Sequence, residues 1–284
     1  MCSLIEEEKN KAKELLSYYK GTKIVELTPN NVYTVMAITN LDSNYQKAAD
    51  EDTIPIKEKG DKSENYNRGG SSAYWFKQLK ESVDSTKYEE IICNCVNSVD
   101  RENSTHLNAD GVGRKEISKR IKDAWGNLES LKEELKKRDF SEKGIIHILS
   151  KETKPGDRNK YKPRVNISFA SKFCQIACYY LFDGEEQDNF SKYDTVVKNV
   201  IFSGIYQKQL PIKKTTPEKK DLEKENYKNN YGELYKKYSD YVDAIIESLP
   251  EKISRHGFDQ LVWYYYKGKS EKELQALANS VKDS

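Results

Sequence analysis

The chain has 284 residues, of which 36% are hydrophobic, so it is long enough and apolar enough to bury a substantial core. Its 48 Lys and Arg residues are balanced by 46 Asp and Glu residues, which excludes a protein whose whole surface is basic. Any DNA-binding surface must therefore be a local patch.

The cysteines and the apolar pattern narrow the class of protein further. Five cysteines, an odd number without a CxxC pair, predict neither a disulfide framework nor a zinc site, and they favour a reducing, cytoplasmic compartment. No apolar run approaches the roughly 20 residues that a membrane span needs, and the first residues are charged rather than signal-like. We therefore expect a soluble cytoplasmic protein that has no membrane partner.

The N-terminal part of the chain gives three different patterns. Residues 4–19 place apolar side chains at near-helical spacing among charges, which predicts an amphipathic helix. Residues 23–39 fit either a short hairpin or a helix that is capped by Asn30 or Asn31. Residues 40–72 are polar and poor in apolar side chains, which predicts a long loop.

The rest of the chain is dominated by helical spacing of apolar residues. Helices are predicted from Tyr74 onward, and then at 88–99, 114–125, 128–137, 143–150, 227–248 and 254–280. Residues 211–225 contain two prolines and many charges, which is typical of a linker. We expect a mainly α protein with an N-terminal helical region, a central catalytic helical region and a C-terminal region that packs back on the fold, over residues 1–105, 106–210 and 211–284.

The segment 167–201 carries the residues with the clearest chemical interest. An apolar face predicts a helix in which Lys172 is the only ionised residue before Asp183, and Lys172 lies at the edge of that face. Partial desolvation disfavours an ammonium and leaves more neutral amine, which is the nucleophilic form. The ordinary alternative is a lysine whose charged end reaches into water past an apolar stem.

Asp194 follows this helix in a second recognisable setting. Tyr193 and Asp194 lead into a predicted helix that extends to Ile201, so Asp194 is expected to act as its N-cap. Capping alone is a sufficient explanation of an aspartate at this position.

Taken in order, these features resemble the catalytic core of the 8-oxoguanine DNA glycosylase fold in the helix-hairpin-helix superfamily. The matching elements are Ala170-Ser171-Lys172, an apolar helix, a short loop, and Tyr193-Asp194-Thr195-Val196-Val197. The resemblance implies a helix-hairpin-helix glycosylase fold with two helical subdomains around a cleft. It also implies that Lys172 attacks the sugar C1′ and that Asp194 stabilises the positive charge developing on the sugar, with Arg164 and Ser171 among the DNA contacts.

The chain departs from the family just before Lys172, where the glycine-rich hairpin is expected. Residues 161–166 contain no glycine, whereas the sequence Gly111-Val112-Gly113 occurs earlier, ahead of a predicted helix. Backbone N–H groups at such a helix start hold phosphates, and Arg114 and Lys115 would add positive charge there. An ordinary Asp-Gly turn explains the same residues, and Lys115 would be a rival nucleophile if this were the hairpin.

The aromatic C-terminal segment is the candidate for base recognition. Members of this superfamily close the base pocket with an aromatic and a polar residue from a late helix, because a flipped base needs a stacking face and a hydrogen-bonding partner. Gln260 and Trp263 share a helical face, so Gln260 is expected to read the base while Trp263 or Tyr264 stacks on it. The alternative is a helix that packs through its aromatic residues.

The resulting hypothesis is a DNA glycosylase that flips a damaged or modified base out of double-stranded DNA and excises it. Lysine chemistry would add AP lyase activity, through a Schiff base and β-elimination. We expect a monomer with no metal and no other cofactor, acting in DNA repair or in antiviral defence against phage. One alternative is a catalytically inactive helical protein that binds nucleic acid or has a regulatory role. Another is a protein-interaction module.

Overall fold

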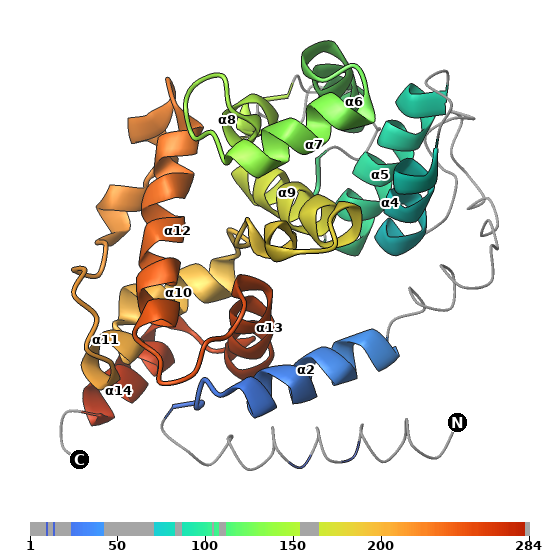
Figure 1. Ribbon diagram of the computed structural model, residues 1–284. Helices are drawn as coiled ribbons and strands as arrows, with labels where there is room; N and C mark the ends of the chain where they lie inside the picture. The colour runs from blue at the N-terminus through green and yellow to red at the C-terminus, as the bar shows by residue number, and fades with distance from the viewer. Residues whose placement is uncertain are drawn as a thin grey trace. The chain divides into compact units, whose positions relative to one another are not determined.

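The computed structural model (Figure 1) describes Asn10, Glu14 and residues 24–42, 71–82, 87–103, 105–107, 112–153 and 165–281. Within these ranges the regular structure consists of α-helices joined by turns and short 3₁₀ segments, which confirms the mainly α class. The helix predicted at 4–19 and the loop predicted at 40–72 lie almost wholly outside the described residues.

The chain divides into two compact units, each built from segments that are distant in sequence. Unit 1 comprises Met1–Ser43, Ser191–Asn226 and Lys236–Ser284, and unit 2 comprises Asn44–Phe190 and Tyr227–Tyr235. These bounds differ from the three consecutive regions inferred from the sequence. Each unit is described by itself below.

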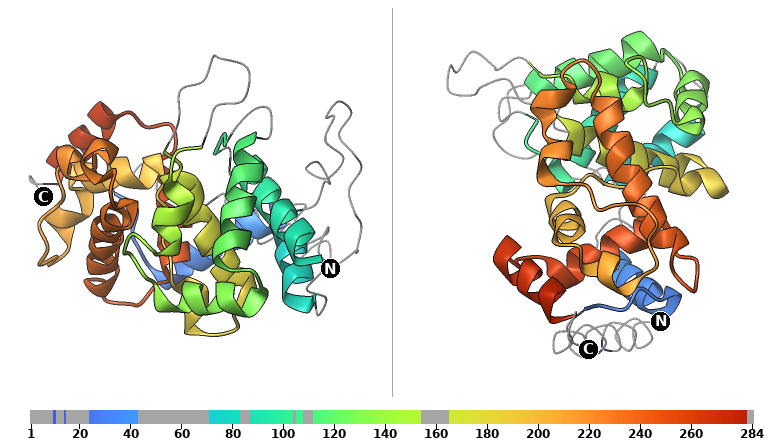
Figure 2. Two further views of the ribbon diagram at one scale, coloured as in Figure 1. Left: turned by 90° about the horizontal axis from the view of Figure 1, so that it is seen from above. Right: turned by 90° about the vertical axis from the view of Figure 1, so that its left-hand side faces the viewer.

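Unit 2 is arranged around one central helix, α9 (Ile167–Leu181). Its neighbours are α4 (Ser72–Glu81), α5 (Tyr88–Glu102), α7 (Leu128–Lys137) and α8 (Ile145–Ser150), while α6 (Val112–Ala124) packs on α5 and α8. Figures 1 and 2 show α9, in yellow, among the green and teal helices. The sequence predicted one apolar face, yet side chains are buried around most of α9 because helices pack against it on several sides.

The start of α4 is held by a glutamate from α5. The Glu102 carboxylate accepts a hydrogen bond from the Ser72 backbone N–H at 2.7 Å, and the Ser71 side chain caps the same helix by accepting from the Tyr74 N–H. Burial raises the pKa of Glu102 to about 7, although the bonds from Ser72 and the charge of Arg101 oppose the shift. Glu102 therefore changes its charge near neutral pH.

Replacing Glu102 with Gln is expected to stabilise the protein at pH 8 and to have little effect at pH 4. The folded protein holds a proton on Glu102 that the unfolded chain releases above pH 4.5, so wild-type stability falls as the pH rises from 4.5 to about 7. The difference between the variants should reach at most about 3 kcal/mol. Urea unfolding at pH 4, 6 and 8 measures it, and a difference that stays constant with pH would contradict the assignment.

Unit 1 combines the first described helix with the last ones. It contains α2 (Pro29–Asp42), α10 (Thr195–Ser203), α11 (Ile205–Gln209), α13 (Arg255–Tyr266) and α14 (Glu271–Ser280), and α12 (Tyr231–Glu247) spans the boundary between the units. Helices α2 and α13 pack closely at Gly257, where a Cβ atom would lie 2.1 Å from Val32 Cγ1. This contact therefore requires glycine at position 257.

Two sequence expectations are settled in unit 1. Residues 29–42 form a helix rather than a hairpin, and Thr28 caps it, because the Thr28 side chain accepts from the Asn31 N–H. The single helix predicted at 254–280 is wrong, since the chain breaks between α13 and α14. Gly268 adopts a positive φ of 84°, and Ser270 then starts α14 in a capping box with Glu273.

Candidate functional site

The Lys172 side chain points into unit 2 instead of into solvent. Lys172 is only 8% exposed, and its Nζ donates a hydrogen bond to the Asn103 backbone oxygen at 3.4 Å. Asn103 is the C-cap of α5, and the carbonyl end of a helix attracts a positive charge. The Lys172 side chain therefore does not extend into water, which was the alternative considered from the sequence.

Ser171 has no exposed surface for the DNA contact expected from the resemblance. Its residue is 0% exposed, and its hydroxyl donates to the Ser168 carbonyl in the same helix at 3.1 Å. The other predicted contact near this helix, Arg164, lies outside the described residues.

The ends of the connection between α8 and α9 are tied together. The Asn166 N–H donates to the Ser150 oxygen at 2.9 Å, and Asn166 Nδ2 donates to the Lys151 oxygen at 3.2 Å. Arg120 on α6 also donates to the oxygens of Lys151 and Glu152, at 2.8 and 2.7 Å. Helices α8 and α9 therefore form a helix pair whose connection begins and ends at neighbouring points.

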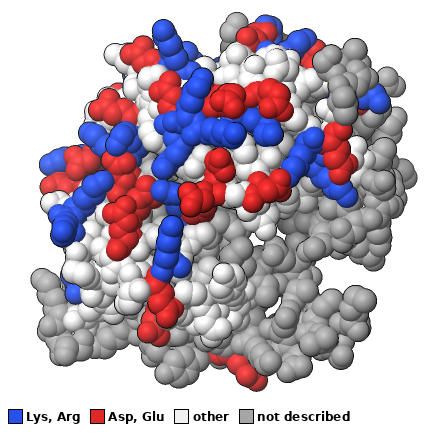
Figure 3. All heavy atoms as spheres, viewed as in Figure 1, with Lys and Arg blue, Asp and Glu red and all other residues white. Residues whose placement is uncertain are grey.

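The two basic residues predicted at the start of α6 have different surroundings. Arg114 is partly buried, and its Nε donates to the Asp100 carboxylate at 2.7 Å. Lys115 is exposed. On the one face of the molecule that Figure 3 draws, the described basic and acidic side chains are interleaved, so no large patch of one charge sign covers that part of the described surface.

Asp194 in unit 1 is the N-cap of α10, as the sequence predicted. Its backbone is extended, with φ −106° and ψ 147°, and its Oδ1 accepts from the Val196 N–H at 2.8 Å. The Asp194 N–H in turn donates to the Lys192 oxygen at 3.0 Å, and that oxygen also accepts from the Tyr238 hydroxyl at 2.6 Å. Local backbone and side-chain bonds thus fix the orientation of this carboxylate.

A buried ionic cluster next to Asp194 escaped the sequence analysis. Lys192 Nζ lies 3.4 Å from Asp259 Oδ2 on α13, and the two side chains are only 13% and 5% exposed. Burial and the nearby Lys192 charge lower the pKa of His256 to about 3, so this imidazole is neutral at pH 7. The cluster joins the segment before α10 to the first turn and a half of α13. The sequence pattern that could have indicated this cluster is that Lys192 and Asp259 each stand among aromatic and apolar residues.

Lys198 is a second lysine that the sequence analysis missed. It lies one helical turn after Asp194, with its Nζ 5.5 Å from the Tyr193 ring centroid. Burial, and then the charge of Lys219, lowers the pKa of Lys198, while Asp194 and Glu271 oppose the shift. Lys198 is therefore a rival candidate nucleophile within unit 1.

The predicted base-recognition residues lie on a partly exposed edge of α13. Gln260, Trp263 and Tyr264 are half-buried, whereas the following Tyr265 and Tyr266 are buried in unit 1. The rings of Trp263 and Tyr264 meet edge to face, with centroids 5.5 Å apart. Lys267 Nζ lies 3.8 Å from the Trp263 centroid and covers one face of that ring. Packing in the core therefore explains Tyr265 and Tyr266, whereas Trp263 and Tyr264 keep part of their surface exposed.

The predicted site residues fall in both units. Unit 2 contains Lys172, Ser171, Arg114 and Lys115, and unit 1 contains Asp194, Gln260, Trp263 and Tyr264. In the described part of the chain, no His, Cys, Asp and Glu side chains form a group of three or more that could hold a metal ion. No helix of the described residues is long and apolar enough to cross a membrane. Compared with protein-family models, curated proteins and solved structures, the chain has no significant match.

Proposed function

We propose that this chain is a DNA glycosylase that excises a damaged or modified base from double-stranded DNA and cleaves the resulting abasic site. The observation that carries the proposal is the inward position of Lys172, whose Nζ is held at the C-terminal end of α5. The contact with the Asn103 oxygen keeps Lys172 Nζ out of bulk water, and the amine becomes a nucleophile when it leaves this oxygen and gives up its proton. The sequence around Lys172 and Asp194 supports the same activity through its resemblance to the glycosylase core.

In the proposed reaction, the neutral Lys172 amine attacks C1′ while the glycosidic bond breaks. The base leaves with the bonding electrons and takes up a proton, and the amine loses a proton as its new N–C bond forms. The resemblance to the glycosylase core assigns to the Asp194 carboxylate the stabilisation of the positive charge that develops on the sugar. Opening of the sugar gives a Schiff base, and loss of a C2′ proton then expels the 3′ phosphate.

The edge of α13 provides the proposed base pocket. A flipped base needs an aromatic face and a partner for its hydrogen-bonding edge. Because Lys267 covers one face of Trp263, we assign stacking to Tyr264 and edge recognition to Gln260. The same chemistry would serve either repair of damaged DNA or defence against phage DNA that carries modified bases, in a monomeric cytoplasmic protein.

Borohydride trapping tests the activity directly. The purified protein is incubated with duplexes that carry 8-oxoguanine, an abasic site or a modified cytosine, and cross-linked protein is sought on a denaturing gel. A cross-linked band together with base release supports the proposal and identifies the substrate class. Base release without a band would contradict the lysine mechanism, and DNA binding without base release would favour an inactive nucleic-acid-binding protein.

Replacing Asp194 with Asn should separate capping from catalysis. Asn caps a helix as well as Asp, so the α10 N-terminus and the free energy of unfolding should change little. The lost negative charge should slow base excision by roughly 10²–10³-fold. Single-turnover base release measures the rate, and excision by Asp194→Asn at the wild-type rate would assign Asp194 to capping alone.

A further inference from the structure

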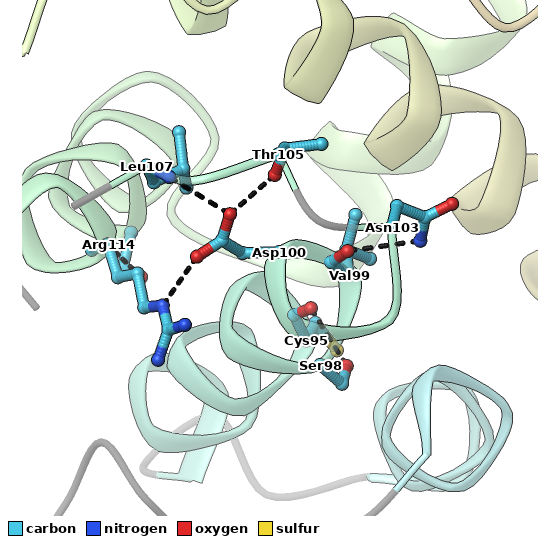
Figure 4. A network of polar contacts seen from close by, with 9 residues as sticks. Cys95, Ser98, Val99, Asp100, Asn103, Thr105, Leu107 and Arg114 are labelled. Atoms are coloured by element: carbon cyan, nitrogen blue, oxygen red, sulfur yellow. Dashed lines mark hydrogen bonds and ion pairs between the residues drawn. The ribbon is translucent and has the colours of Figure 1, made fainter. Parts of the chain in front are cut away.

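The buried Asp100 carboxylate binds two described residues of the connection between α5 and α6, and also Arg114 on α6. Its Oδ1 accepts from the Thr105 hydroxyl at 2.5 Å and from the Leu107 N–H at 3.0 Å. Its Oδ2 accepts from Arg114 Nε at 2.7 Å. Figure 4 shows Asp100 between the turn that carries Thr105 and Leu107 and the Arg114 side chain of α6.

This arrangement orients the Arg114 guanidinium in a particular way. The Asp100 side chain is 2% exposed, whereas the Arg114 side chain is 24% exposed. The bond to Asp100 uses Nε, and in Figure 4 the two terminal nitrogens lie on the side away from the carboxylate. A guanidinium held in this way presents parallel N–H donors that match two oxygens of a phosphate.

We infer that Asp100 is a positioning residue that aligns Arg114 to bind a backbone phosphate of duplex DNA. The inference rests on the proposed function for its ligand, and it adds a residue that no sequence pattern had singled out. A carboxylate that is fully satisfied and buried contributes no DNA contact of its own. Its effect on binding must therefore pass through Arg114.

The test measures binding of the full chain to an undamaged duplex by fluorescence anisotropy over a series of salt concentrations. Arg114→Met should weaken binding about tenfold at low salt, because one charge-assisted phosphate contact is lost. The slope of log affinity against log salt should fall by about 1. Lys119→Met is the matched control, since Lys119 is exposed on the same helix and pairs with Asp123, and it should leave the slope unchanged.

Asp100→Asn tests the positioning role. It should weaken DNA binding in the wild-type background and have no further effect in the Arg114→Met background. The double variant also removes the unpaired buried carboxylate that Arg114→Met alone leaves, and circular dichroism checks that each variant is folded. An equal effect of Asp100→Asn in both backgrounds would overturn the positioning role.

Two other outcomes separate this inference from the proposed function. If the wild-type protein excises a base and Arg114→Met binds DNA with the wild-type affinity and slope, the phosphate site is wrong and the glycosylase remains. If the wild-type protein does not bind duplex DNA at any salt concentration, both the inference and the proposed function are overturned.

Discussion

The Lys172→Gln variant is expected to form no covalent adduct with DNA under borohydride and to lose strand nicking. An amide nitrogen does not form a Schiff base, so the lyase step has no replacement nucleophile. The Gln side chain is one bond shorter than Lys and loses the 3.4 Å contact with the Asn103 oxygen, so the free energy of unfolding should fall by about 1–3 kcal/mol. Gel analysis of trapped complexes and nicked strands measures both losses, and urea unfolding measures the stability.

Two further lysines serve as matched controls for this experiment. Lys198 lies one turn after Asp194 and has a lowered pKa, and Lys115 is the exposed residue that would be the nucleophile of the alternative hairpin. Lys198→Gln and Lys115→Gln should each keep the trapped band. A band that persists in Lys172→Gln and disappears in either control variant would transfer the nucleophile to that other lysine.

Local patterns in the sequence predicted most of the helices and one detail of the site. The spacing of apolar residues located α4 to α9, and an aspartate before a helical run correctly predicted the cap of α10. The break between α13 and α14 was missed because Tyr266 and Leu274, on either side of the polar residues 267–273, are eight positions apart and fit one face of a continuous helix. The spacing therefore resembled a single helix, although Ser270 and Glu273 are a capping pair.

Local sequence patterns could not predict the polar partners of the site residues. Lys172 bonds to an oxygen 69 positions earlier in the chain, and Lys192 pairs with Asp259 on a different helix. No sequence window contains both members of either pair, so periodicity and motif spacing carry no information about them. For the same reason the sequence placed Arg114 at the helix start but gave no sign of the Asp100 carboxylate that orients it.

Replacing Asp259 with Asn should destabilise unit 1 strongly. Lys192 would keep its charge in a site that leaves its side chain 13% exposed, without the carboxylate that balances that charge. Removing one member of a buried ion pair costs about 3–5 kcal/mol, because the remaining charge is desolvated without compensation. Urea unfolding measures this loss, and hydrogen exchange should place the loss of protection in α10 and α13.

The paired substitution Lys192→Met with Asp259→Leu distinguishes a stabilising ion pair from one that serves to orient the site. Apolar side chains of similar size remove both desolvated charges, so the double variant should recover most of the stability lost in Asp259→Asn. Base excision should nevertheless be slower than in the wild type, because Lys192 belongs to the segment that carries Asp194 and Asp259 adjoins Gln260. Recovery of full activity together with stability would show that the buried pair has no part in the alignment of the site.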